Sequence, residues 1–386
     1  MAPVLTNETT GPHYRPAWAE VDLDAIRHNT ALLVERAAPA HLMAVVKADG
    51  YGHGAVAVAL AALESGATWL GVALVEEGIE LREAGIGVPV LLLSEPPPQA
   101  AEVVVEAGLT PVVYTRRFID ALAKAAADAG RVEQLPVHLK VDTGMHRVGC
   151  DPAEAGDLAR AVRRHGELVL EGLLTHLAAA DVPSEADYTA AQLARFEAVR
   201  AELARARIRP PVVHAANSAG LLSGAPARFS LVRCGIALYG IPPAPTLETA
   251  AALRPALSLR AKVASVRRLP AGERISYGLR YRLESDSTVA VVPMGYADGV
   301  ARRLGEVGAD VLIGGRRRPI AGVVTMDQLM VDLGSDTCEP GADVVLVGRQ
   351  GDDEITASEW AQLLGTIPYE VCCAIGPRVP RRYRGG

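Results

Sequence analysis

The sequence predicts an α/β fold in which a (β/α)8 TIM-type barrel is followed by a mostly β C-terminal domain. Three observations lead to this prediction. The chain has 386 residues, which is long for a single hydrophobic core. Its first two thirds alternate short apolar runs with amphipathic, alanine-rich stretches. Its last third alternates apolar and polar residues between glycine-containing turns, as β-strands do.

Apolar runs typical of buried parallel strands recur between residues 42 and 240. They begin near Leu42, Trp69, Pro89, Pro111, Val137, Leu168, Val212 and Ser230. Stretches with helical spacing and a closing glycine, such as PQAAEVVVEAG and RRFIDALAKAAADAG, separate most of them. Eight such units predict a closed barrel. An open doubly wound sheet is the alternative that the pattern leaves.

The flanking segments complete the domain organisation. Residues 1–17 are predicted to be a flexible leader, and residues 18–243 to contain the barrel domain. The first strand, residues 18–21, is expected to pack on the C-terminal domain. A proline- and alanine-rich linker leads into that domain, which spans residues 244–386.

Two helices have clear terminal signals. The stretch after the first strand has Asp22 or Asp24 as a candidate N-cap. The stretch TASEWAQLLG places Thr356 and Glu359 as a capping box and Gly365 as the C-terminal glycine.

Composition argues against several classes of protein. The net charge is −6 and the only basic run lies at residues 378–384, so a nucleic-acid partner is not expected. No stretch is apolar enough to serve as a signal core or to span a bilayer, so no membrane association is expected. The five cysteines are odd in number and lack zinc spacing, which favours reduced thiols in a cytoplasmic protein without a bound metal.

The stretch AVVKADGYGHG, residues 44–54, is the strongest local signal for chemistry. Lys47 follows a buried strand, where its amine can lose its proton and form a Schiff base with an aldehyde cofactor. A glycine-rich loop with Tyr51 then precedes a helix that begins near Ala55, which is a plausible phosphate seat. The alternative is a surface lysine whose stem packs on apolar neighbours.

Further polar residues fall at the carboxyl ends of the predicted strands, which is the face where barrels hold their active sites. They are Lys140, Asp142, Arg147, His176, Asn217, Ser218 and Arg233. Alone, His176 fits a core histidine, Lys140 a paired buried charge and Ser218 a helix N-cap. Their convergence on one rim favours an active site.

The motifs also resemble those of one family, the bacterial alanine racemases. The resemblance rests on AWAEVDLDAIRHN, VKADGYGHG, KVDTGMHRVG, GLLTHLA, ANSAG, VRCGIALYG, ISYGLRY, MGYADG, TMDQ and IPYEV, in that order. It implies an isomerase that interconverts L- and D-alanine with pyridoxal 5'-phosphate and supplies D-alanine for peptidoglycan. It also implies a head-to-tail homodimer whose active sites use both chains.

The resemblance further implies roles for individual residues. Lys47 would hold the cofactor as an internal aldimine, and Arg233 would face the pyridine nitrogen with His176 under the ring. Arg147 would contact the phenolic oxygen and the substrate carboxylate, beside Lys140 as a possible carbamylated lysine. The phosphate would be held by Tyr51, Ser218, the backbone of Gly235 and Ile236, and Tyr369.

A second copy of the chain would contribute Tyr277, Met326 and Asp327 to the same site. Racemisation needs a proton carrier on each face of a planar carbon, and Lys47 with Tyr277 would supply the two bases.

Three alternatives differ in observable ways. A decarboxylase of the ornithine or diaminopimelate type would be expected to have an acid where Arg233 stands. A carrier resembling the single-domain barrel proteins of vitamin B6 homeostasis would lack the second domain. A racemase for another amino acid, such as serine, would differ in pocket size, which the sequence does not reveal.

Overall fold

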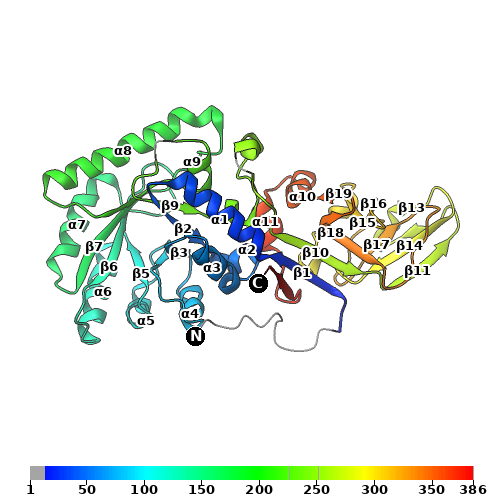
Figure 1. Cartoon of the computed structure of the whole chain (residues 1–386), viewed down its shortest axis with the longest axis horizontal. Coiled ribbons are helices and arrows are strands. Elements are labelled where there is room, and N and C mark those ends of the chain that lie inside the picture. The colour runs from blue at the N-terminus through cyan, green and yellow to red at the C-terminus, as the bar shows by residue number, and fades with distance from the viewer. Residues whose placement is uncertain (1–13, 226, 251, 386) are drawn as a thin grey trace. The chain divides into compact units, whose positions relative to one another are not determined.

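The predicted barrel and the separate β-rich domain are both present in the computed structural model, which describes residues 14–225, 227–250 and 252–385. The chain divides into two compact units (Figure 1). Unit 1 comprises Ala25–Gly50 and Ala55–Arg254. Unit 2 comprises Tyr51–Gly54 together with the described parts of Ala2–Asp24 and Pro255–Gly386. Residues 1–13 of the predicted leader lie outside the described residues.

Within the described residues, unit 1 contains eight parallel strands, which confirms the predicted set. They are β2 (His41–Val45), β3 (Trp69–Val72), β4 (Val90–Leu92), β5 (Thr110–Val113), β6 (Leu135–Lys140), β7 (Leu168–Leu174), β8 (Val212–His214) and β9 (Leu231–Cys234). Strands β2 to β8 pair in sequence order, and β9 pairs with β2. The two end strands, β8 and β9, are joined by backbone hydrogen bonds. Ser230 N–H donates to the Val213 carbonyl at 3.1 Å, and Arg233 N–H donates to the Ala216 carbonyl at 3.0 Å. The open sheet is therefore excluded.

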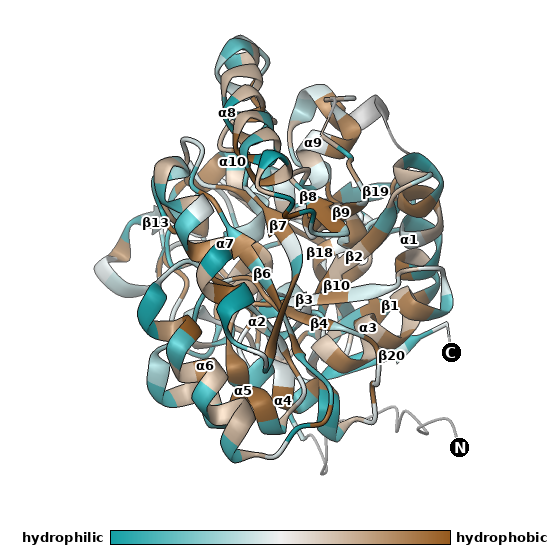
Figure 2. Cartoon of the chain, turned by 90° about the vertical axis from the view of Figure 1, so that its left-hand side faces the viewer, coloured by the Kyte–Doolittle hydropathy of each residue, from teal (hydrophilic) through white to brown (hydrophobic). Residues whose placement is uncertain are grey.

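Helices follow the strands as the spacing predicts. They are α1 (Leu23–Ala37), α3 (Ala55–Glu64), α4 (Val75–Glu83), α5 (Ala101–Glu106), α6 (Arg116–Asp128), α7 (Ala155–Arg164), α8 (Ala186–Arg205) and α9 (Ser218–Leu222). In α6, Thr115 caps the first turn, and Phe118, Ile119 and Leu122 are fully buried. Each such side chain contributes roughly 1.5–3 kcal/mol when removed from water. Figure 2 shows the barrel strands as mainly hydrophobic, whereas helices such as α6 and α7 carry both colours.

Unit 2 is mostly β. One sheet has the order β16 (Arg316–Pro319), β15 (Asp310–Ile313), β18 (Asp343–Gln350), β10 (Leu257–Lys262), β1 (Ala17–Asp22) and β20 (Arg381–Arg384), with β19 (Asp353–Ile355) on β18. A second sheet joins β11 (Ser265–Leu269), β14 (Ser287–Val292) and β17 (Leu329–Asp332). A short hairpin pairs β12 (Arg274–Ile275) with β13 (Tyr281–Arg282). The first strand of the chain thus belongs to this unit, antiparallel to β10 and parallel to β20.

The predicted helix signals hold in part. Helix α1 begins at Leu23, directly after Asp22, and Asp24 lies in its first turn. Helix α10 (Ala357–Leu364) is capped by the Thr356 hydroxyl, which accepts from Glu359 N–H at 3.0 Å, and it ends at the left-handed Gly365. The second half of the predicted capping box is wrong, because the Glu359 carboxylate accepts from the Arg317 guanidinium instead.

Helix α11 (Pro368–Cys373) follows α10 in unit 2. The five cysteines are all reduced. None of the helices in the described ranges combines the length and apolar character needed to cross a membrane.

Candidate active site

Lys47 begins a left-handed helical turn, α2 (Lys47–Gly52), where the sequence predicts a glycine-rich loop. Ala48, Asp49 and Tyr51 have φ angles of 53°, 52° and 53°, and Gly50 and Gly52 have 59° and 79°. Left-handed backbone costs an L-residue roughly 1–2 kcal/mol, so a run of it needs support from the surrounding structure. The predicted loop is therefore corrected to a strained turn that directly follows the lysine.

Two carboxylates of unit 1 provide this support. The Glu77 carboxylate accepts from Ala48 N–H at 2.6 Å and from Ala73 N–H at 2.7 Å. The Asp49 carboxylate accepts from Ala55 N–H at 3.0 Å and so joins the turn to the start of α3. Charge-assisted bonds of this kind are about twice as strong as neutral ones. The backbone next to Lys47 is thereby held in a conformation that it would not adopt alone.

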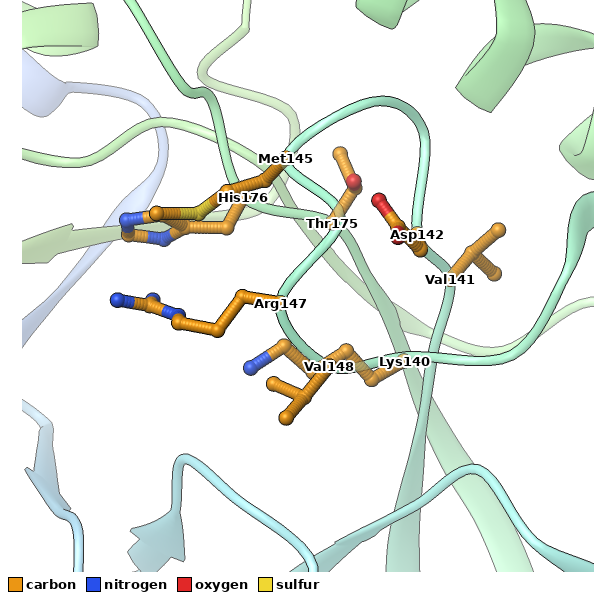
Figure 3. A pocket seen from close by; sticks show the side chains of 8 residues that line it. All are labelled: Lys140, Val141, Asp142, Met145, Arg147, Val148, Thr175 and His176. Atoms are coloured by element: carbon orange, nitrogen blue, oxygen red, sulfur yellow. The ribbon is translucent and has the colours of Figure 1, made fainter.

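A pocket at the carboxyl ends of β6 and β7 collects several of the predicted residues. It is lined by Lys140, Val141, Asp142, Met145, Arg147, Val148, Thr175 and His176 (Figure 3). In Figure 3 the Arg147 guanidinium, the His176 ring and the Lys140 amine point to the same side, and the Asp142 carboxylate lies apart from them. Asp142 accepts from Gly144 N–H at 2.9 Å and from His146 N–H at 3.0 Å. The charge of Asp142 raises the pKa of Lys140, but less than burial and the neighbouring cations lower it.

Arg233, on β9, is buried, and its bonds go to neutral partners. Its guanidinium meets His214 Nδ1 at 3.0 Å and His176 Nδ1 at 3.1 Å, and donates to the carbonyl oxygens of Thr175 and Ala215 at 2.9 and 3.0 Å. Burial lowers the pKa of Arg233 to about 10, so it remains a cation at neutral pH. Both bonded imidazoles must accept from this cation, which fixes Nδ1 as their unprotonated nitrogen.

The same cations depress the pKa values of their neighbours. Burial, together with the charges of Arg233, Arg147 and Lys47, lowers the pKa of Lys140 to about 7. The Lys140 amine donates to the Leu93 carbonyl at 2.7 Å. Burial and the same positive charges hold the pKa of His176 well below its usual range. A rim with this much positive charge fits an anionic occupant.

The residues expected around a phosphate fall into two groups. In unit 1, Ser218 is the buried first residue of α9, and its hydroxyl accepts from Gly235 N–H at 3.0 Å, next to Ile236. Asn217, rather than Ser218, caps α9 by accepting from Gly220 N–H at 2.9 Å. The N-cap explanation of Ser218 is therefore wrong, because its hydroxyl bonds the backbone of Gly235 instead. In unit 2, the rings of Tyr51 and Tyr369 lie 6.1 Å apart.

Tyr277 stands on a strained and exposed turn of unit 2. Its side chain is 73% exposed, although tyrosine usually buries most of its ring. Ser276 has φ 68° and ψ 178°, and Leu279 has φ 51°, both unusual for residues other than glycine. The Ser276 hydroxyl donates to the Val323 carbonyl at 2.6 Å and holds the turn. The turn presents the tyrosine outward.

Met326 and Asp327 are also exposed residues of unit 2. Met326 is 53% exposed, and the Asp327 carboxylate accepts from Arg378 at 2.7 Å. Arg378 lies 3.5 Å from the buried Asp298 carboxylate, which also pairs with Arg15 at 2.8 Å. Asp327 is therefore an anchored carboxylate and not a free one.

Unit 1 thus brings together Lys47, Lys140, Arg147, His176 and Arg233, and places Ser218 against Gly235. Sequence reasoning missed two members of this group, Thr175 and His214, which bond Arg233. For His214 the signal was a single histidine inside an otherwise apolar strand run, VVHAA.

Comparisons with known proteins agree with this arrangement. Two family models match the chain, "Alanine racemase, N-terminal domain" over residues 21–243 and "Alanine racemase, C-terminal domain" over residues 256–383. The alanine racemase of Symbiobacterium thermophilum is 50% identical over 372 residues, covering 96% of this chain and 98% of that protein. That of Thermobifida fusca is 46% identical with the same coverage.

Solved structures are similar over almost the whole chain. Alanine racemase from a D-cycloserine-producing Streptomyces lavendulae superposes with a TM-score of 0.91 at 42% identity, covering 97% of this chain and 98% of that one. Histidine racemase from Leuconostoc mesenteroides superposes with a TM-score of 0.90 at 29% identity, covering 98% of this chain and 100% of that one.

Proposed function

The chain belongs to the alanine racemase family, and from this membership we propose that it is an isomerase that interconverts L-alanine and D-alanine. The observation that carries the proposal is the cationic rim of unit 1, where Lys47, Arg147 and Arg233 surround a neutral His176. Such a rim suits a small anionic amino acid together with an anionic cofactor. The decarboxylase alternative lacks support, because a cation stands where an acid would be expected.

We propose pyridoxal 5'-phosphate as the cofactor, since the donor set fits it. Lys47 would hold it covalently, and Arg233 would meet its ring nitrogen as a cation. The Ser218 hydroxyl and the backbone of Gly235 and Ile236 would hold the phosphate, as would Tyr51 and Tyr369. When bound, this cofactor withdraws electron density from the α-carbon of an amino acid and so acidifies its α-proton.

Two residues would move protons. The Lys47 amine would take or return the α-proton on one face of the substrate, and the Tyr277 hydroxyl would do so on the other. To take the α-proton, the Lys47 amine must be neutral. Arg233 cannot give up its proton at neutral pH, so it would leave the ring nitrogen unprotonated and limit side reactions.

Arg147 would orient the substrate carboxylate, with Lys140 as its support. A lysine with a pKa of about 7 is substantially neutral at physiological pH, and a neutral amine can attack carbon dioxide. The nitrogen–carbon bond that forms releases one proton and leaves a carbamate. That anion would hold the Arg147 fork in place. Mass spectrometry under bicarbonate would reveal the added carbon dioxide.

Tyr277, Met326 and Asp327 would come from a second copy of the chain, so that a homodimer forms the complete sites. The exposure of Tyr277 and Met326 supports this proposal, because both side chains are accessible to a second copy. We further propose that the enzyme acts in the cytoplasm and supplies D-alanine for peptidoglycan, as the family resemblance implies.

The proposal is tested by proton NMR of the purified protein with L-alanine and pyridoxal phosphate in deuterated water, followed by chiral analysis. We expect the α-proton signal to disappear while D-alanine forms. Serine and histidine are tested in parallel, because a histidine racemase shares the fold. Exchange with one of these amino acids and none with alanine would reassign the substrate. Bound cofactor without any exchange would favour a carrier.

A further inference from the structure

Behind Arg233, buried side chains form a continuous hydrogen-bonded row through the barrel. Arg233 Nη1 meets His214 Nδ1 at 3.0 Å, and His214 Nε2 meets His138 Nδ1 at 2.9 Å. His138 Nε2 then meets Glu171 Oε2 at 3.1 Å. Both histidines are fully buried, whereas the Glu171 side chain is 30% exposed. The row therefore joins a partly exposed carboxylate on β7 to the buried cation of the site.

The direction of each bond follows from the two ends. Arg233 can only donate, so His214 accepts at Nδ1 and carries its proton at Nε2. That proton is donated to His138 Nδ1, which leaves the His138 proton at Nε2, facing Glu171. The Glu171 carboxylate can accept this hydrogen bond, so each donor in the row has an acceptor. Burial lowers the pKa of His138 and holds that of His214 well below its usual range, so both rings are neutral.

The fold makes specific room for this row. Val137 on β6 pairs with Leu170, whereas the next residue, His138, pairs with Gly172. Glu171 is therefore the extra residue of a β-bulge, a feature that redirects a side chain. A Cβ at position 172 would lie 2.2 Å from His138 Cγ and Nδ1, so only glycine leaves space for the ring. The Trp69 ring, 5.3 Å from that of His138, packs on it as well.

We propose that Glu171 is a positioning residue that acts through His138 and His214 to fix the orientation and hydrogen bonding of Arg233. This inference rests on the proposed function, in which Arg233 faces the cofactor ring. Without an acceptor at position 171, the row can reverse so that both histidines carry their protons at Nδ1. His214 would then present a donor to the donors of Arg233, and the guanidinium would move.

The test uses the full-length, cofactor-loaded protein labelled with [15N]histidine. Nitrogen chemical shifts distinguish protonated from unprotonated ring nitrogens, and His138→Gln and His214→Gln identify the two signals. In the wild-type protein we expect both residues to be neutral with the proton at Nε2. A proton at Nδ1 of His214, or a charged imidazole at either position, would overturn the inference without the need for any position-171 variant.

Three variants then separate positioning from structure. Glu171→Leu removes the acceptor, and we expect mixed tautomers at both histidines with a kcat reduced about tenfold and KM nearly unchanged. Glu171→Gln keeps a carbonyl acceptor and should retain the wild-type tautomers and most of the kcat. Glu167→Gln, on the turn before β7, is the matched control. Unchanged tautomers in Glu171→Leu would refute the inference. The nitrogen spectra need no substrate. They therefore test the hydrogen-bonded row even if the protein does not racemise alanine.

Discussion

In their charged forms Lys47, Lys140, Arg147 and Arg233 repel one another, and each lowers the pKa of His176. Like charges at such sites destabilise the folded state unless an anion is bound. Asp142, the nearby carboxylate, accepts hydrogen bonds from the loop that contains His146, and its charge offsets only part of this repulsion at Lys140. At the scale of single residues, this cluster of cations therefore lowers the stability of the folded chain and at the same time forms a site that suits an anion.

Lys140 should make folding stability depend on pH. Its pKa is about 7 in the folded chain against 10.5 normally, because burial and Arg233 disfavour its charged form. Between these values the unfolded chain binds the extra proton, so the free energy of unfolding rises with pH across that window. Relative to Lys140→Met, we expect wild-type stability to increase by up to about 1.4 kcal/mol per pH unit.

Urea unfolding between pH 7 and 9.5 in buffers free of carbon dioxide measures this difference. Lys124→Met, at an exposed lysine of α6, is the control. The difference in stability between wild type and this variant should not rise with pH. A difference between wild type and Lys140→Met that stays flat with pH would contradict the lowered pKa.

Tyr277→Phe should affect the two directions of the reaction unequally. The substitution removes the hydroxyl that we propose as the proton carrier on one face, and leaves Lys47 on the other. Loss of α-proton exchange should be greater from L-alanine than from D-alanine, by about 100-fold or more for the affected direction. Deuterium incorporation into each enantiomer, followed by NMR, measures this. Tyr296→Phe, at another exposed tyrosine, is the control, and equal losses in both directions would count against two bases.

At the scale of elements, the sequence predicts what depends on local pattern and misses what depends on distant partners. The eight barrel strands were predictable because each is a buried apolar run between turn residues. The left-handed turn at Ala48 was not, because its conformation is imposed by Glu77, 29 residues away. The bulge at Glu171 likewise depends on the His138 ring of the neighbouring strand.

Glu77→Ala should therefore weaken cofactor binding from a distance. Its carboxylate accepts from Ala48, Ala73 and Leu74, and removing it leaves three amides without this acceptor. We expect a stability loss on the order of 3 kcal/mol, together with weaker retention of pyridoxal phosphate as the turn after Lys47 relaxes. Thermal unfolding and cofactor titration measure the two effects. Glu76→Ala, at the exposed neighbouring residue of α4, should change neither. Undiminished cofactor affinity in Glu77→Ala would argue against the supporting role.

Gly322→Ala should displace the turn that presents Tyr277. A Cβ at Gly322 would lie 2.8 Å from Ser276 Cβ and 2.9 Å from the Ile275 carbonyl. The variant should reproduce the unequal loss of exchange expected for Tyr277→Phe, in a weaker form. Gly334→Ala is a matched control, because Gly334 also has positive φ, at 63°, but has nothing within 4 Å of its added Cβ. If both alanine variants lose exchange alike, the loss comes from backbone strain at a positive φ and not from a displaced turn.

At the scale of the whole molecule, the two units differ in how far their contributions could be predicted. Residues of unit 1 could be proposed from physics, because parallel strands bring their carboxyl ends to one rim. Tyr277 and Met326 of unit 2 could not, because an exposed tyrosine or methionine has no local signature of function. The roles proposed for them rest on the family resemblance alone. Tyr277, Leu279 and Met326 are 73%, 50% and 53% exposed, which suits burial against a second copy.

Mixing two inactive variants tests whether the sites are shared. Lys47→Ala and Tyr277→Ala should each be inactive as homodimers. If each site takes Lys47 from one chain and Tyr277 from the other, a mixed dimer has one site with both substitutions and one with neither. Random reassembly makes half of the dimers mixed, so activity should recover to about one quarter of wild type.

Recovery should require exchange of subunits, and each variant carried alone through the same dissociation and reassembly is the control. A site built within one chain would instead leave every site with a substitution, and the mixture would remain inactive. Recovery therefore requires a site that is shared between chains, because only in a mixed dimer can an intact Lys47 of one chain meet an intact Tyr277 of the other.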